Sequence, residues 1–85
     1  MVALVTGGGR GIGRGIALAL AKQGWAVAIV ARSAGQLAET ARLAQGRVLT
    51  IATDVADPAS AMTLVQRVET ELGPITLLVN HAGIG

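Results

Sequence analysis

Four short apolar runs, separated by segments with helical periodicity, constrain the fold of this 85-residue chain more than any other feature. The runs are almost unbroken in apolar character and rich in Val, Ile and Leu, which is typical of strands covered on both faces. Such strands are usually parallel, and the short connections permit only right-handed crossovers. The predicted strands are Val2 to Val5, Trp25 to Ala31, Val48 to Ala52 and Ile75 to Val79.

Three helices are predicted between the strands, each from a stripe of apolar residues that ends at a glycine. Ser33 and Asp57 are predicted N-caps, and Pro58 suits the first position of the third helix. The stripes are Ile12, Ile16 and Leu20, then Leu37, Ala41 and Ala44, then Ala61, Leu64, Val65, Val68 and Leu72. The terminating glycines are Gly24, Gly46 and Gly73. The alternation predicts one α/β domain over residues 1–85, with about half of a doubly wound parallel sheet.

The composition excludes several other classes of protein. The chain has no Cys and one His, which excludes disulfides, thiolate metal sites and multi-histidine zinc sites. No apolar run approaches the roughly 20 residues of a membrane helix, and no basic segment precedes the first run as in a secretory signal. The net charge is only +2, the basic residues are dispersed along the chain, and the chain has one aromatic residue. These features argue against nucleic acid as a partner. A cytoplasmic protein is expected.

A glycine-rich turn follows the first strand and leads directly into the first helix. Its sequence is Thr6-Gly7-Gly8-Gly9-Arg10-Gly11-Ile12-Gly13. Glycines permit positive φ and let the backbone approach a phosphate without a Cβ in the way, while the helix N-terminus presents N–H groups. Such turns also serve tight packing alone, but the strand-turn-helix setting favours a phosphate-bearing ligand.

The spacing of the glycines narrows the choice of ligand. A Walker A loop would have Lys and then Ser or Thr after its last glycine, where this chain has Arg14 and Gly15, so an ATPase or GTPase is excluded. The pattern G-x-G-x-x-G does not occur either. Thr6 is followed instead by Gly7, Gly11 and Gly13 in the spacing G-x-x-x-G-x-G.

This pattern resembles the fingerprint T-G-x-x-x-G-x-G of the short-chain dehydrogenases/reductases, in their single-domain branch. Three further segments resemble that family in chain order: Asp54-Val55, Gly73-Pro74-Ile75 and Asn80-His81-Ala82-Gly83. The resemblance implies a Rossmann-type sheet with strand order 3-2-1-4. It also implies an NAD(P)-dependent oxidoreductase that moves hydride between the cofactor and a small carbonyl or alcohol substrate, similar in general to 3-oxoacyl-thioester reductases.

The resemblance further implies which residues bind the cofactor. The turn would hold the pyrophosphate, and Asp54 with Val55 would lie beside the adenine. Asn80 would bond across the strand ends and face the ribose, with Ala82 and Gly83 allowing close approach. His81 stands where the family usually has Asn, and we expect it to be structural. The predicted cofactor-binding residues are Gly7, Gly9, Arg10, Gly11, Ile12, Gly13, Arg32, Ser33, Asp54, Val55, Asn80, Ala82 and Gly83.

Arg32 favours NADP over NAD as the cofactor. About 20 residues beyond the glycines, a carboxylate binds the ribose hydroxyls of NAD, whereas a cation accommodates the 2′-phosphate of NADP. Ala31 and Arg32 occupy that place, and Arg10 lies at the same edge of the predicted sheet. Guanidinium groups suit a phosphate because they donate two parallel hydrogen bonds.

The catalytic residues of the resembled family are missing from these 85 residues. In that family a Ser and a Tyr-x-x-x-Lys pair follow the fifth strand, but this chain has no Tyr and a single Lys, Lys22. We therefore expect the cofactor-binding N-terminal part of an oxidoreductase, inactive alone, with its fourth strand at an open sheet edge and homo-oligomeric when complete. Two alternatives stay open: a non-catalytic nucleotide-binding module, and a doubly wound methyltransferase that uses adenosylmethionine.

Overall fold

The computed structural model describes residues 1–7, 9–54 and 58–80, which form four strands and three helices in the predicted alternation. All strand pairs are parallel, and the sheet has the order β3-β2-β1-β4. The predicted α/β class and strand order are therefore confirmed. Within these residues, no helix has both the length and the apolar character that crossing a membrane requires. The elements are β1 (Val2–Thr6), α1 (Gly11–Lys22), β2 (Ala26–Ala31), α2 (Ala34–Leu43), β3 (Val48–Ala52), α3 (Pro58–Leu72) and β4 (Leu77–Asn80).

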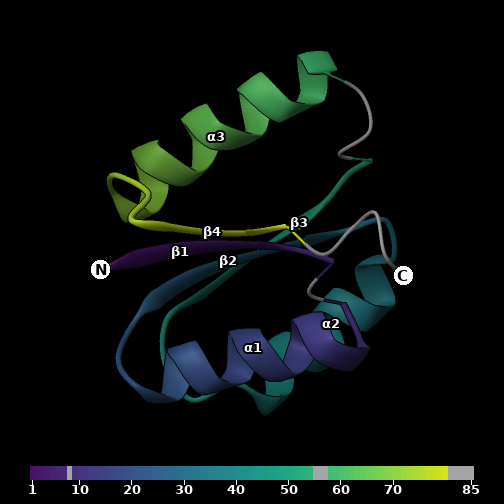
Figure 1. Cartoon of the computed structure of the whole chain (residues 1–85). Helices are drawn as coiled ribbons and strands as arrows, with labels where there is room; N and C mark the ends of the chain where they lie inside the picture. Colours follow the sequence, from purple (N-terminus) through teal and green to yellow (C-terminus); the bar gives the residue numbers. More distant parts are fainter. Residues whose placement is uncertain (8, 55–57, 81–85) are drawn as a thin grey trace.

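The sheet lies between two helical layers. Figure 1 shows α3 on one face and both α1 and α2 on the other. Side chains of the central strands alternate between two apolar clusters: Leu4 and Val30 belong to the cluster under α3, and Val5 and Ile29 to the cluster under α1 and α2. This double cover explains why the apolar runs contain almost no polar residue.

The inner face of α1 differs from the predicted one. Ile12 is 67% exposed, so the predicted stripe is wrong at its first position, and its other two members are only partly buried. Small side chains on the inner face let the helix approach β1 and β2 closely, and the larger ones pack along its flank. The buried residues of α1 are Gly13, Ala17 and Ala21.

The predicted helix ends at Gly24 and Gly73 are confirmed. Gly24 has φ 96°, and its N–H and that of Trp25 donate to the carbonyls of Ala21 and Leu20 at 3.0 and 3.1 Å, as in a Schellman motif. Gly73, with φ 111°, follows the last residue of α3.

The helix starts agree with the prediction where they are described. Ser33 is the N-cap of α2, and its Oγ accepts a hydrogen bond from the N–H of Gln36 at 3.2 Å. Pro58 is the first residue of α3, as predicted. The predicted N-cap Asp57 lies outside the described residues.

The connection after α2 corrects the predicted role of Gly46. The helix ends at Leu43, and Ala44 is an extended C-cap that still packs against the apolar cluster. Gly46 has φ 129°, and a Cβ there would lie 2.9 Å from the carbonyl oxygen of Ala21. Gly46 therefore permits the connection to β3 to pass close to the end of α1, and it does not terminate α2.

Gly46→Ala is expected to lower the free energy of unfolding by about 1 to 3 kcal/mol, because backbone strain and the contact with Ala21 must both be accommodated. Gly35→Ala in α2 is the matched control, since its nearest neighbour would be Ser33 Oγ at 4.0 Å. The control is expected to be neutral or stabilising by up to about 1 kcal/mol. Urea unfolding followed by circular dichroism measures both, and equal stabilities would contradict the close approach.

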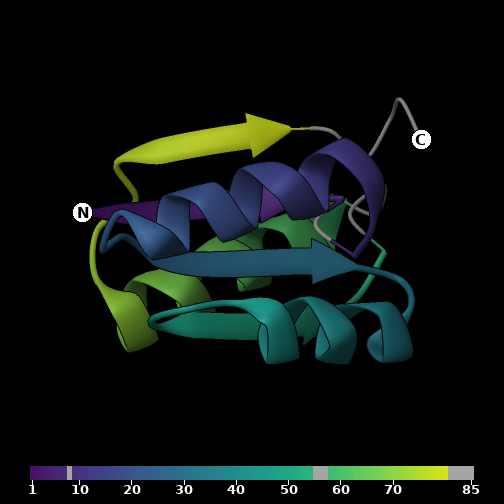
Figure 2. The same cartoon turned by 90° about the horizontal axis from the view of Figure 1, so that it is seen from below.

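β4 forms an edge of the described sheet, as predicted, and Figure 2 shows it beside β1 at that edge. Leu78 is 59% exposed although it shares the α3 face with its register partner Leu4. The described sheet therefore presents apolar surface at its β4 side.

Val65 was predicted in the apolar stripe of α3 but is 39% exposed, because Leu64 and Val68 make the inner face of that helix.

Candidate functional site

The glycine-rich turn lies where the direction of the sheet topology reverses. From β1 the chain proceeds to β2 and β3 on one side and then crosses back to β4 on the other. The carboxyl ends of β2 and β4 point to the same end of the molecule (Figure 2). Ligands of open α/β sheets bind in the crevice at such a switch point.

The turn has the backbone conformation that the sequence predicts. Gly7 and Gly11 have φ of 79° and 61°, and the N–H of Gly7 donates to the carbonyl of Val30 at 2.7 Å. A Cβ on Gly11 would meet no described atom within 4 Å, so open space lies there. Arg10 is the exposed N-cap of α1 and makes no side-chain cap bond. The first N–H groups of a helix have no intrahelical partner and can bind an anion.

The inner side of the turn is packed against the rest of the fold. Gly9 and Gly13 are both buried. A Cβ on Gly9 would lie 3.1 Å from Gln36 Oε1 and 3.2 Å from the Cβ of Ala31. The turn therefore has an open side and a side that α2 closes.

Asn80 joins the ends of β4 and β1, as predicted. It lies in register with Thr6, whose Oγ1 donates a hydrogen bond to Asn80 Oδ1 at 2.9 Å. This bond holds the two strand ends together directly beside the switch point.

The other predicted residues follow the carboxyl ends of β2 and β3. Arg32 is exposed directly after β2, and Ser33 caps α2 with its Oγ. Asp54 is exposed two residues after β3. Val55, Ala82 and Gly83, together with His81, lie outside the described residues.

The charges at the end of the sheet where the carboxyl ends of the strands lie favour binding of an anion. Neither α1 nor α2 has an acidic residue in its first turn. Exposed guanidinium groups, those of Arg10 and Arg32, follow the adjacent strands β1 and β2. Among the described residues no group of three His, Cys, Asp or Glu side chains could hold a metal ion.

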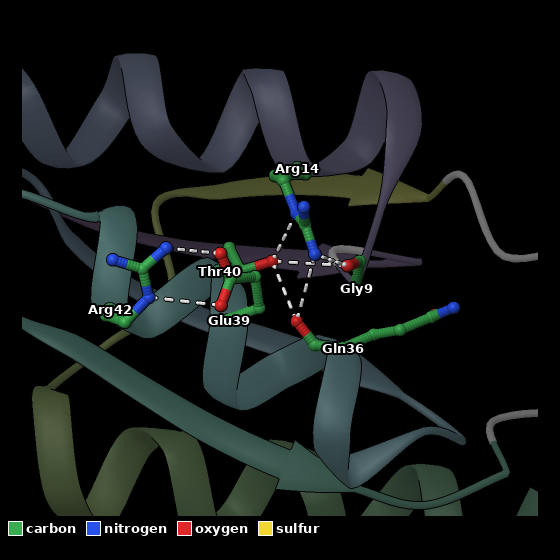
Figure 3. A network of polar contacts seen from close by, with 6 residues as sticks. All are labelled: Gly9, Arg14, Gln36, Glu39, Thr40 and Arg42. Carbon is green, nitrogen blue, oxygen red and sulfur yellow. Dashed lines mark hydrogen bonds and ion pairs between the residues drawn. The ribbon is translucent and has the colours of Figure 1, made fainter.

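A polar network behind the turn was missed by the sequence analysis, and Figure 3 shows it. Arg14 Nε donates to Thr40 Oγ1 at 2.8 Å, and Arg14 Nη2 donates to the carbonyls of Gly9 at 2.6 Å and Gln36 at 3.2 Å. Thr40 is 1% exposed. The sequence signal for this network was Thr40, which lies three residues after Leu37 on the buried face of the helix. A polar residue on such a face needs a hydrogen-bond partner.

Another arginine, Arg42 on α2, has a different environment from that of Arg14. Arg42 forms an exposed, two-pronged ion pair with Glu39, with Nε at 3.1 Å from Oε2. The hydrogen bond from Arg42 lowers the pKa of Glu39 below its usual value, and the charges of Arg42 and Arg14 act in the same direction. Exposed pairs of this kind contribute little to stability, which makes Arg42 a suitable control for Arg14.

Comparison with known proteins identifies relatives over the whole chain. The family model described as short chain dehydrogenase matches residues 1–85. The mouse 3-oxoacyl-[acyl-carrier-protein] reductase is 41% identical over 83 residues, which cover 98% of this chain and 35% of that protein. The short-chain dehydrogenase/reductase homolog YusS of Bacillus subtilis is 37% identical over an alignment of 87 positions, which covers 98% of this chain and 80% of that protein.

Solved structures agree with this assignment. L-Sorbose reductase from Gluconobacter frateurii, complexed with NADPH and L-sorbose, is 41% identical, with a TM-score of 0.89 over 99% of this chain and 34% of that one. The chain thus spans about a third of the length of the mouse and Gluconobacter enzymes. The fingerprint at the switch point, the strand order and the family match agree: the chain belongs to the short-chain dehydrogenase family of oxidoreductases.

Proposed function

We propose that this chain is the dinucleotide-binding part of an NADP(H)-dependent oxidoreductase that reduces a small carbonyl compound or oxidises the corresponding alcohol. The observation that carries the proposal is the positive-φ turn of Gly7 and Gly11 at the β1/β4 switch point. When bound, the cofactor supplies or accepts the hydride. The residues of this chain bind the cofactor and orient it.

The turn would hold the diphosphate on its open side. Gly11 lets the backbone approach the ligand because no side chain occupies the space before it. N–H groups at the start of α1 donate to phosphate oxygens, and the positive end of the helix dipole adds to their attraction. Ile12, exposed beside these groups, would lie toward the nicotinamide.

The start of α2 would hold the 2′-phosphate that distinguishes NADP from NAD. Arg32 and Arg10 are exposed after adjacent strands, and each can donate two hydrogen bonds to a phosphate. Ser33 Oγ accepts the cap bond from Gln36 N–H, which leaves the hydroxyl hydrogen to donate to the ligand. Ala31 stands where NAD-binding folds carry a carboxylate.

The remaining contacts would flank the rest of the cofactor. Asp54, exposed after β3, and Val55 would lie beside the adenine. Asn80 is fixed at the end of β4 by Thr6 and would face the nicotinamide-side ribose, with Ala82 and Gly83 allowing close approach.

We also propose that residues 1–85 form one part of a single larger domain. The chain spans 34 to 35% of two related enzymes, and its β4 edge exposes Leu77 and Leu78. Strands and helices of the remaining part would cover that edge, supply the groups that transfer protons to the substrate, and support assembly into a homo-oligomer in the cytoplasm.

The protein encoded by the complete reading frame that contains these residues is expected to bind NADP⁺ at least about tenfold more tightly than NAD⁺, because Arg32 and Arg10 pair with the 2′-phosphate. Arg32→Gln is expected to weaken NADP⁺ binding by about tenfold and to leave NAD⁺ binding unchanged. Isothermal titration calorimetry at fixed salt measures the four dissociation constants.

Lys22→Gln is the matched control for this test, since it removes one positive charge from the other end of α1. It is expected to change neither constant, which separates pairing at the site from the general field of the protein. Equal affinity for both cofactors, or tighter binding of NAD⁺, would overturn the assignment of NADP.

A further inference from the structure

The guanidinium group of Arg14 connects three segments that meet behind the glycine-rich turn. Arg14 lies in the first turn of α1, and its bonds reach the carbonyl of Gly9 in the turn, the carbonyl of Gln36 and the hydroxyl of Thr40 in α2. Figure 3 shows the side chain directed away from the helix toward these acceptors. Arg14 is therefore placed behind the ligand side of the turn, where it can act only through the backbone.

The bond to Gly9 fixes how one peptide group of the turn is oriented. Arg14 Nη2 lies 2.6 Å from the Gly9 oxygen, which also lies 3.2 Å from Thr40 Oγ1. A peptide group is planar and trans, so its C=O and N–H point in opposite directions. Because the Gly9 carbonyl is held against α2, the N–H of Arg10 points away from α2. The carbonyl dipole, which would repel a phosphate, is also kept away from the phosphate site.

A separate observation shows that the turn and α2 are packed together with little tolerance. Any side chain on Gly9 would come within 3.2 Å of the Cβ of Gln36. Gln36 is also the residue whose N–H is capped by Ser33 at the start of α2. The turn is therefore joined to the first residues of α2 by van der Waals contact as well as by the Arg14 bonds.

We propose that Arg14 is a positioning residue that sets the spacing between the diphosphate site at the turn and the ribose-phosphate site at the start of α2. The inference rests on the proposed function for the identity of these two sites. A ligand that spans both sites needs the correct spacing, whereas a ligand that occupies one site does not. Misplacement of about 1 Å can cost on the order of a hundredfold in an oriented interaction.

The first test compares hydrogen exchange in the ligand-free protein encoded by the complete reading frame. Arg14→Gln removes the charge and the fork and is expected to speed amide exchange at Gly7, whose N–H donates to Val30, and in residues 36–40. Arg42→Gln, which removes the exposed guanidinium that pairs with Glu39, is expected to leave exchange at Gly7 unchanged. Equal protection of Gly7 and of residues 36–40 in Arg14→Gln and the wild type would overturn the positioning role.

The second test separates spacing from general damage to the fold. Arg14→Gln is expected to weaken NADP⁺ binding by about ten- to a hundredfold, while 2′-AMP, which contacts the turn only through the side chain of Arg10, is expected to lose less than about threefold. Calorimetry measures both ligands. Equal losses for NADP⁺ and 2′-AMP, or no loss for either, would overturn the inference.

Two variants of Thr40, which accepts a hydrogen bond from Arg14, test whether the hydroxyl group is required. Thr40→Val removes the hydroxyl that Arg14 Nε binds and is expected to show the same selective loss of NADP⁺ binding. Thr40→Ser retains the hydroxyl and is expected to bind NADP⁺ within about threefold of the wild type. If the wild type binds no dinucleotide, the proposed function fails, and the exchange experiment alone then decides the role of Arg14.

Discussion

Replacing Gly11 with alanine is expected to weaken NADP⁺ binding at least about tenfold, because φ at this position is 61°. The left-handed conformation costs a residue with a Cβ about 1 to 2 kcal/mol, so the turn of the free variant is expected to relax away from it. Returning to the binding conformation then lowers the affinity, and 1.4 kcal/mol corresponds to a tenfold change. The added Cβ also enters the open space before the turn, where the phosphate is proposed to lie. Isothermal titration calorimetry with NADP⁺ measures the loss.

Gly15→Ala is the matched control, since it introduces the same methyl group one turn further along α1. No described atom lies within 4 Å of its Cβ, and Gly15 is not among the residues with positive φ. Alanine in a helix interior is about 1 kcal/mol more favourable than glycine, so this variant should be more stable and bind NADP⁺ normally. Gly11→Asn separates the two causes at the turn, because asparagine tolerates positive φ but still adds a side chain. Equal binding by Gly11→Ala and Gly15→Ala would contradict the role of the turn.

Most element limits could be predicted because they depend on local rules. β3 matches its predicted limits, and β2 begins one residue later than predicted. Gly24 ends α1 through bonds that involve only its neighbours in sequence. The resemblance to a known family supplied the order 3-2-1-4, which the strand pairing confirms.

The inner face of α1 could not be predicted from periodicity alone. Counting large apolar residues placed Ile12 inside, whereas the helix packs through Gly13, Ala17 and Ala21. The preference for small residues depends on how closely the helix approaches the sheet, which is a tertiary property.

The Arg14 network was missed for a related reason. Arg14 and Thr40 are 26 residues apart in sequence, and nothing near Arg14 in the chain shows that its charge is directed inward. Arg14 and Thr40 lie behind the turn, whereas Arg10 and Arg32 among the predicted residues are exposed. A sequence pattern indicates glycines and charges that are close in the chain better than it indicates contacts between distant segments.

Leu37→Ala is expected to lower the free energy of unfolding by about 2 to 5 kcal/mol, the usual cost of truncating a buried leucine. Leu37 is 1% exposed and belongs to the cluster between α2 and the sheet, while Leu43 on the same helix is 44% exposed. Leu43→Ala is therefore the control, with an expected change within about 0.5 kcal/mol. Because α2 follows its N-cap Ser33 and carries Gln36 and Thr40, loosening it should also weaken NADP⁺ binding, and saturating NADP⁺ should recover part of the lost stability. Urea unfolding with and without NADP⁺ measures both effects. Equal losses of stability and of NADP⁺ binding in the two leucine variants would show that the packing of α2 does not support the site.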